Sequence, residues 1–149
     1  MIYKNLLKQA SALLESQPNQ ISLLANASAF LNDVIPNLNW VGFYLFDQEN
    51  LTVGPFQGKV ACSLIKPGAG VCGTALVTKQ TQVVPNVHKI SNHIVCDENS
   101  NSEVVVPIIK NNLIFGVLDV DSPIINRFDS ELVSFLENFV VIITNLIDI

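Results

Sequence analysis

Apolar residues recur at helical spacing in two segments at the start of the chain. Residues 3–15 place their apolar side chains three and four positions apart, and residues 21–35 repeat the pattern. Such spacing gathers the apolar side chains on one face of a helix. The intervening SQPNQ is rich in turn-forming residues. The pattern therefore predicts two helices joined by a short turn.

Strand patterns follow in two pairs. Residues 39–46 (NWVGFYLF) are aromatic and β-branched, and after the turn DQEN, residues 51–57 (LTVGPFQ) indicate a returning antiparallel strand. Residues 103–110 and 113–121 flank Asn111-Asn112, which is a strong hairpin signal. Two antiparallel strand pairs are thus predicted.

The remaining segments complete the predicted fold. Residues 58–101 are rich in Gly, Pro, Asn and Ser, with a short helix expected near 72–79 and a short strand near 81–85. A last helix is predicted from near Asp129 to the chain end. This order predicts an α+β fold, an antiparallel sheet flanked by helices, in one domain over residues 1–149. Long irregular segments in compact domains are usually functional, which directs attention to the middle of the chain.

Composition narrows the class of protein. Hydrophobic residues make up 49% of the chain and charged residues 14%, which describes a globule with a substantial core. The net charge is −5 and the Lys and Arg residues are scattered singly, so no nucleic-acid partner is expected. The N-terminus lacks a continuous apolar run, and the C-terminal FVVIITNLIDI is shorter than the ~20 residues that span a bilayer. We therefore predict a cytoplasmic protein without membrane contact, whose apolar C-terminal helix permits a homodimer.

Three cysteines, Cys62, Cys72 and Cys96, lie in the irregular middle. An odd number is a poor framework for a secreted disulfide scaffold, and cytosolic thiols are buried, metal-bound or redox-active. No C-x-x-C pair is present. His93 stands three residues before Cys96, a spacing that suits two metal ligands or a thiol–imidazole pair, but His88 and His93 both fit ordinary loop residues, so no metal is predicted. The clustering fits redox chemistry through a sulfenic acid and a disulfide, although burial of any one cysteine stays open. Spacing alone does not show which pair meets.

The segment GAGVCG, residues 68–73, matches the dinucleotide-binding pattern G-x-G-x-x-G. That motif needs a preceding strand and a crossover helix, whereas here a turn (IKPG) precedes it within an antiparallel pattern. The glycines instead permit a tight turn around Cys72. No cofactor is therefore predicted.

The predicted strands carry two further sets of candidate residues. Asp119 and Asp121 are two positions apart, so they share a strand face, and Glu103 begins the partner strand. Converging acids would hold a cationic group or keep one another partly protonated; the alternative is that they are solvated strand-end residues. Trp40 and Tyr44 also share a face, either as core aromatics or as a wall for a small apolar or cationic group.

The segments NWVGFYL, GPFQGKVAC, GVCGTA, HIVCDENSNSEVVVPI and GVLDVDSP occur in this order. Together they resemble the free methionine-(R)-sulfoxide reductase family, which consists of stand-alone enzymes with the GAF fold. The resemblance covers residues 38–129, and its cysteine-bearing segments are more specific than any single motif above. It implies a GAF-like antiparallel sheet flanked by N- and C-terminal helices.

The resemblance also implies a reaction. Cys96 matches the family's nucleophile, which attacks the sulfur of free L-methionine-(R)-sulfoxide, releases methionine and becomes a sulfenic acid. Cys72 matches the resolving cysteine that closes a disulfide, and Cys62 matches a third cysteine that can also pair with Cys72. Thioredoxin would restore the thiols.

The same resemblance implies how the substrate is held. Trp40 and Tyr44 match an aromatic wall around its methyl and sulfoxide end, and Glu103, Asp119 and Asp121 match an acidic cluster beside it. The chemistry agrees, because the substrate's ammonium needs carboxylates. Its oxygen needs a proton, which suits an acid whose pKa is raised by neighbouring acids.

The loop before Cys96 departs from the family pattern. Asn86 stands where the family often has Asp, Ser91-Asn92 where it has Pro-Gly, and Val95 where it has Ala. These changes bear on the mobility of the loop and on disulfide closure. The alternative function is a non-catalytic GAF module that binds a small molecule or senses oxidation. The fold alone does not separate the two, and the intact cysteine set favours the enzyme.

Overall fold

A computed structural model describes residues 2–94 and 96–149; Met1 and Val95, the latter within the HIVCD segment, lie outside the described residues. The elements follow in this order: α1 Ile2–Leu14, α2 Gln20–Val34, β1 Trp40–Phe46, β2 Leu51–Gly58, β3 Leu64–Ile65, α3 Gly70–Thr78, β4 Gln82–Val84, the 3-10 turn η1 Val87–Lys89, β5 Ser102–Lys110, β6 Leu113–Ser122 and α4 Ser130–Leu146. Across this described part, the helices are too short or too polar for a bilayer crossing.

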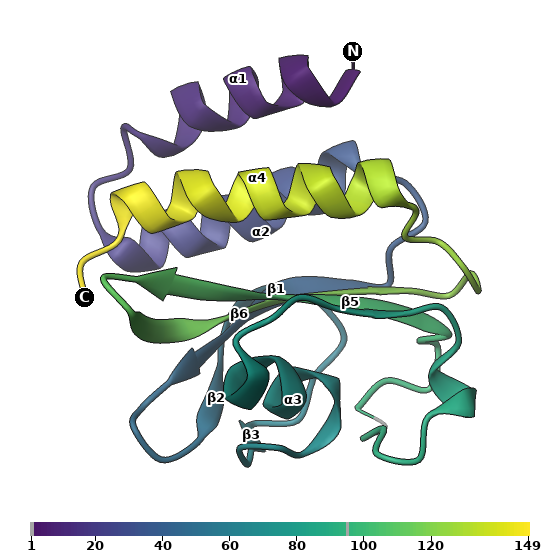
Figure 1. Cartoon of the computed structure of the whole chain (residues 1–149). Helices are drawn as coiled ribbons and strands as arrows, with labels where there is room; N and C mark the ends of the chain where they lie inside the picture. Colours follow the sequence, from purple (N-terminus) through teal and green to yellow (C-terminus); the bar gives the residue numbers. More distant parts are fainter. Residues whose placement is uncertain (1, 95) are drawn as a thin grey trace.

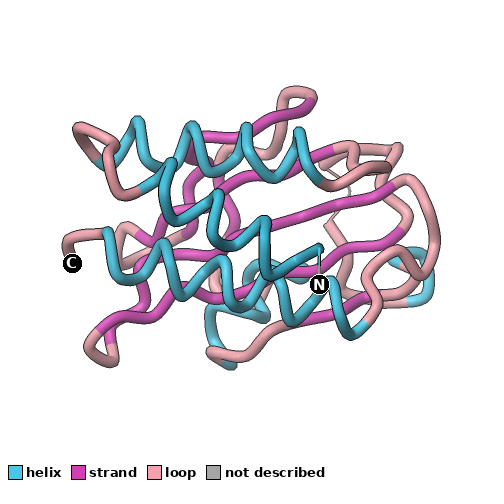
Figure 2. Tube along the Cα trace, turned by 90° about the horizontal axis from the view of Figure 1, so that it is seen from above, coloured by secondary structure: helices cyan, strands magenta, loops and turns pink. Residues whose placement is uncertain are grey.

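The strands form one antiparallel sheet in the order β3-β2-β1-β6-β5-β4. Helices α1, α2 and α4 lie on one side of the sheet, and α3 lies on the other (Figure 1). Figure 2 shows the helical layer from above, lying across the strands. The predicted α+β fold with N- and C-terminal helices against an antiparallel sheet is confirmed.

The predicted elements are present, with small differences at their ends. Asn111 and Asn112 both have left-handed backbone angles, φ 54° and 64°, as a tight type I′ hairpin requires. Asp129 caps α4 by accepting a hydrogen bond from the Leu132 amide at 2.8 Å. Two elements in the middle, β3 and η1, were not predicted, because segments of two or three residues carry no periodic pattern.

Alternation of side chains across the strands divides the core into two layers. Val104 and Val106 of β5 pack with Leu118 of β6 against the helical layer. Val105 and Val117 point the other way and pack with α3. The helical side is the larger of the two layers, and the smaller layer on the α3 side contains the candidate site.

The core layer predicts a stability effect. Leu118 is fully buried against the helices, so Leu118→Ala is expected to lower the free energy of unfolding by about 2–5 kcal/mol. The matched control is Leu113→Ala on the same strand, where the side chain is 57% exposed and the expected change is within about 0.5 kcal/mol. Urea unfolding of the reduced proteins measures both, and equal losses would contradict the core assignment.

Candidate active site

Strand register brings the three acids of the sequence analysis together on the α3 side of the sheet. Glu103 of β5 lies directly opposite Asp121 of β6, and Asp121 also lies opposite Trp40 of β1. Asp119 lies two positions earlier on the same face of β6. All three carboxyl residues are buried and line one pocket, so the alternative of solvated strand-end acids does not apply.

Burial sets the protonation of this acid cluster. It raises the pKa of Glu103 well above its ordinary range, and the charges of Asp119 and Asp121 raise it further. Burial, followed by the charge of Asp119, does the same to the pKa of Asp121, and burial raises the pKa of Asp119. The cluster therefore keeps protons at a pH at which isolated carboxyls have lost them. Asp119 Oδ1 is buried and lacks a hydrogen-bond partner within the described residues, which leaves an acceptor for a ligand.

Cys72 lies beside these acids in the first turn of α3. Its Sγ and carboxylate oxygens of Glu103 and Asp119 lie within 4.8 Å of one another, which is close enough to share a cation. Burial, then the charges of Asp119 and Glu103, raises the pKa of the Cys72 thiol well above its ordinary value. The thiolate is thus disfavoured here. The spacing of cysteines and histidines along the chain does not reveal this grouping, because its donors come from distant parts of the sequence.

Among the described residues, a disulfide joins Cys62 to Cys96. Their Cα atoms are 5.4 Å apart, within the range that disulfides require. Cys72 is a free, buried thiol. The expected pairing of Cys72 with Cys96, or with Cys62, is therefore corrected. The physical reason is that α3 holds Cys72 among the carboxyls, whereas Cys62 lies in the segment before β3, next to the Cys96 loop.

Trp40 and Tyr44 form one wall of the pocket, with ring centroids 5.7 Å apart. Their polar atoms also donate hydrogen bonds to the backbone of the segment that carries Cys62. Trp40 Nε1 donates to the Lys59 carbonyl at 3.2 Å, and the Tyr44 hydroxyl donates to the Cys62 carbonyl at 2.9 Å. Burial, then the charge of Asp119, raises the pKa of Tyr44, so this hydroxyl stays protonated and able to donate. The same two aromatic residues therefore line the pocket and hold the segment that carries Cys62.

Asparagine amides hold the loop that carries Cys96. Asn39, just before β1, donates to Asp97 Oδ2 at 3.0 Å and to Ser100 Oγ at 2.9 Å. On the other side of Cys96, Asn92 donates to the Gly68 carbonyl at 3.0 Å. Asn92 is one of the departures from the family pattern, and a glycine there would have no side chain to make this bond. The loop is anchored to β1 at one end and to the α3 turn at the other.

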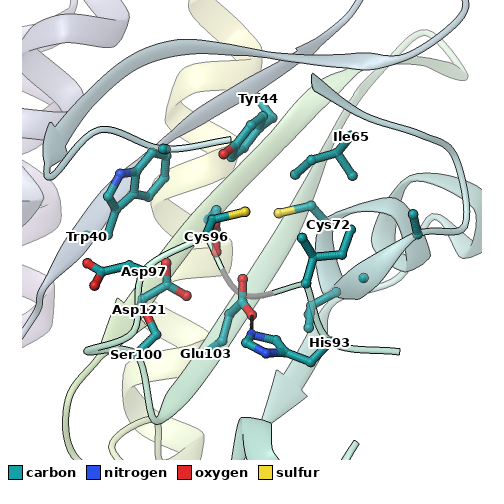
Figure 3. A pocket seen from close by; sticks show the side chains of 16 residues that line it. Trp40, Tyr44, Ile65, Cys72, His93, Cys96, Asp97, Ser100, Glu103 and Asp121 are labelled. Carbon is teal, nitrogen blue, oxygen red and sulfur yellow. Dashed lines mark ion pairs between the residues drawn. The ribbon is translucent and has the colours of Figure 1, made fainter. Parts of the chain in front are cut away.

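His93 enters the pocket next to the acids. Its Nε2 lies 3.8 Å from Glu103 Oε1, joined by the dashed line in Figure 3, which is too long for a hydrogen bond. Burial, followed by the charge of His88, lowers the pKa of His93, so at neutral pH the contact is not a full ion pair. The sequence predicts His93 to be an ordinary loop residue. Its position three residues before Cys96 was the available signal.

The pocket has an aromatic side and an acidic side. Figure 3 shows the Cys96 and Cys72 side chains between the aromatic wall and the acids. Among the lining residues in the described part of the chain there is no lysine or arginine. The site thus suits a small ligand with a positive group, an apolar group and an atom for a cysteine to attack.

The fold and site define a GAF domain, and the family profile described as "GAF domain" matches residues 2–147. The chain is 45% identical to the free methionine-R-sulfoxide reductase of Escherichia coli K12 over 129 residues, 87% of this chain and 78% of the relative. The structure of Staphylococcus aureus fRMsr in complex with substrate shares 50% identity, with a TM-score of 0.92, and covers 98% of this chain and 95% of its own. A putative GAF sensor protein from Burkholderia vietnamiensis shares 48% identity, with a TM-score of 0.93, over 97% of this chain and 92% of its own.

This chain belongs to the free methionine-R-sulfoxide reductase family of GAF-domain proteins.

The acid cluster predicts how stability depends on pH. The folded pKa of Glu103 and Asp121 lies above the ordinary values of 4.5 and 3.8, so the folded chain binds more protons than the unfolded chain in that range. The free energy of unfolding should therefore fall as pH rises from the ordinary values toward the raised ones. Glu103→Gln should make this fall shallower, while the exposed control Glu49→Gln should leave it unchanged. Urea unfolding between about pH 4 and 8 measures the slopes, and identical slopes in all three proteins would contradict the assignment.

The Tyr44 hydrogen bond predicts a second effect. Tyr44→Phe leaves the Cys62 carbonyl without its donor, so we expect a loss of about 1 kcal/mol in the reduced protein and slower disulfide closure with diamide. Tyr3→Phe is the control, because its ring keeps the stacking contact with Phe135. Denaturant unfolding and thiol titration report the two quantities. A Tyr44→Phe protein that matches the control in both would rule out the anchoring role.

Proposed function

We propose that this protein reduces free L-methionine-(R)-sulfoxide to methionine. One observation carries the proposal: Cys96, already shown to reach a second thiol, opens onto the same pocket as the acid cluster and the aromatic wall. The named activity of the E. coli relative supports it. So does the substrate-bound S. aureus structure.

The substrate is a zwitterion with a sulfoxide at the end of its side chain. Its ammonium fits the acid cluster, where the unpartnered Asp119 Oδ1 accepts a hydrogen bond. Its methyl group fits against Trp40 and Tyr44, because aromatic faces favour apolar and weakly cationic groups. A methionine sulfoxide within a peptide lacks the free ammonium. The buried acids therefore select the free amino acid.

In the first step the Cys96 thiolate attacks the sulfoxide sulfur. A protonated acid of the cluster gives its proton to the sulfoxide oxygen, which the raised pKa of Glu103 and Asp121 makes available. The oxygen passes to the Cys96 sulfur as the S–O bond to the substrate breaks. The products are methionine, whose sulfur is reduced, and a Cys96 sulfenic acid, whose sulfur is oxidised.

In the second step the Cys62 thiol attacks the sulfenic sulfur and releases water, forming the Cys62–Cys96 disulfide. The resolving role expected for Cys72 thus passes to Cys62. Cys72 instead contributes a protonated thiol next to the acids. A thioredoxin-type dithiol then reduces the disulfide and is itself oxidised.

The test is a thioredoxin-coupled NADPH assay with free methionine-R-sulfoxide, free methionine-S-sulfoxide and a peptide-bound sulfoxide. We expect turnover of the free R epimer alone and none in Cys96→Ser. Cys62→Ser should release about one methionine per chain and then stop, because its sulfenic acid has no partner thiol. Cys72→Ser should still form the Cys62–Cys96 disulfide after one equivalent of substrate.

Two outcomes would overturn the proposal. Absence of turnover with the free R epimer would favour the alternative, a non-catalytic GAF module that binds a small molecule or senses oxidation. Full activity of Cys96→Ser would show that Cys96 is not the nucleophile.

A further inference from the structure

A second, outer groove lies next to the disulfide. It is lined by residues from the two segments that the disulfide joins: Lys59, Val60, Cys96, Asp97, Glu98 and Asn99. Cys96 lines both this groove and the inner pocket, whereas Cys62 lines neither. An external molecule in the groove therefore meets the disulfide at Cys96.

Three partly exposed apolar residues lie close in sequence to the disulfide cysteines, and one of them, Val60, lines the groove. Val60 and Leu64 stand two residues before and after Cys62 and are 90% and 50% exposed, and Ile94, two residues before Cys96, is 38% exposed. Two residues span at most about 7 Å, so each lies close to a disulfide cysteine. A single exposed apolar residue is ordinary, but Val60 is 90% exposed in the groove itself, where a partner can cover it.

The walls of the groove are held in place. Trp40 fixes the Lys59 carbonyl and Tyr44 fixes the Cys62 carbonyl, so Val60 is presented from a segment anchored on both sides. Asn39 fixes Asp97 on the opposite wall. Because all three anchoring residues come from β1 or the position before it, the two walls keep their relative place. A preformed surface loses little entropy when a partner binds.

We propose that this groove docks the dithiol reductant and that the reductant's thiolate attacks Cys96. This inference rests on the proposed function, which requires the disulfide to be recycled. A new S–S bond forms between the reductant and Cys96, and the Cys62–Cys96 bond breaks. The electron pair goes to the Cys62 sulfur, which takes up a proton. The reductant's second thiol then attacks the mixed disulfide, releases Cys96 as a thiol and leaves the reductant oxidised.

The choice of sulfur follows from access and from charge. Both disulfide cysteines are half-buried, and of the two it is Cys96 that lines the groove. Attack there expels a thiolate at Cys62, whose sequence neighbours, Ala61 and Ser63, are uncharged. Attack at Cys62 would instead expel a thiolate at Cys96, directly before Asp97 and Glu98. The thiolate with fewer negatively charged neighbours is the more stable one and therefore the better leaving group.

Trapping identifies the attacked sulfur. The oxidised full-length protein is mixed with a thioredoxin whose second active-site cysteine is replaced by serine, then quenched with iodoacetamide and digested. Mass spectrometry is expected to find thioredoxin linked to the peptide that contains Cys96 and an alkylated Cys62. Thioredoxin linked to Cys62 would overturn the assignment.

A matched pair of variants tests the docking surface. Val60→Asp is expected to lower the rate constant for reduction of the preformed disulfide by thioredoxin about tenfold or more, because it puts a charge into the apolar contact. Reduction by dithiothreitol should be unchanged. The control Val77→Asp changes a valine that is 56% exposed on α3 and should affect neither rate.

The outcomes separate docking from structural damage. An unchanged thioredoxin rate in Val60→Asp would overturn the docking site, and so would an equal loss with dithiothreitol, because that loss would come from the disulfide itself. Both experiments begin from the oxidised protein and use no methionine sulfoxide. Their failure is therefore distinct from a failure of the proposed reductase activity.

Discussion

Hydrogen bonding of β6 between β1 and β5 fixes the direction of the aromatic and acidic side chains of the site. The register pairs Asp121 with both Trp40 and Glu103, so an aromatic wall and two acids meet across three strands. The intervening residues, such as Val120, face the helical layer and are fully buried there. A slip by one residue would turn the acids into the apolar core. The large apolar layer on the helical side therefore holds the polar site in register on the other side.

Burying three carboxyls in this way is costly unless they are neutral or paired. The direction of their pKa shifts shows that proton binding provides part of the compensation. Asp119 Oδ1 has no hydrogen-bond partner among the described residues, so part of the free-energy cost of burying this carboxyl is not compensated. A ligand that brings an ammonium would relieve it. The site thus gains more from binding a cationic ligand than a solvated cluster of acids would. Its retained protons are the ones that the proposed sulfoxide reduction would consume.

The cysteines differ because their surroundings differ. Cys72 is fixed in a helix among acids that disfavour its thiolate. Cys96 and Cys62 lie on segments that meet at the mouth of the pocket, each held by polar contacts from the β1 side of the sheet. Trp40 and Tyr44 serve both the pocket and the disulfide, because their rings form the pocket wall while their polar atoms hold the Cys62 segment. The pocket wall and the Cys62 segment of the disulfide consequently share the same support.

Periodicity in the sequence by itself determined the antiparallel α+β fold, the Asn111-Asn112 hairpin and the shared face of Asp119 and Asp121, because these depend on residues close together in the chain. The cysteine-bearing segments were enough to indicate the family. Tertiary structure alone decided that Cys96 pairs with Cys62 and that Cys72 stays free. It also decided that Asn39 and His93 belong to the site. These outcomes depend on distances between segments far apart in the chain, and those distances are set by how α3 and the loops pack on the sheet. The spacing of residues along the sequence does not reveal such distances.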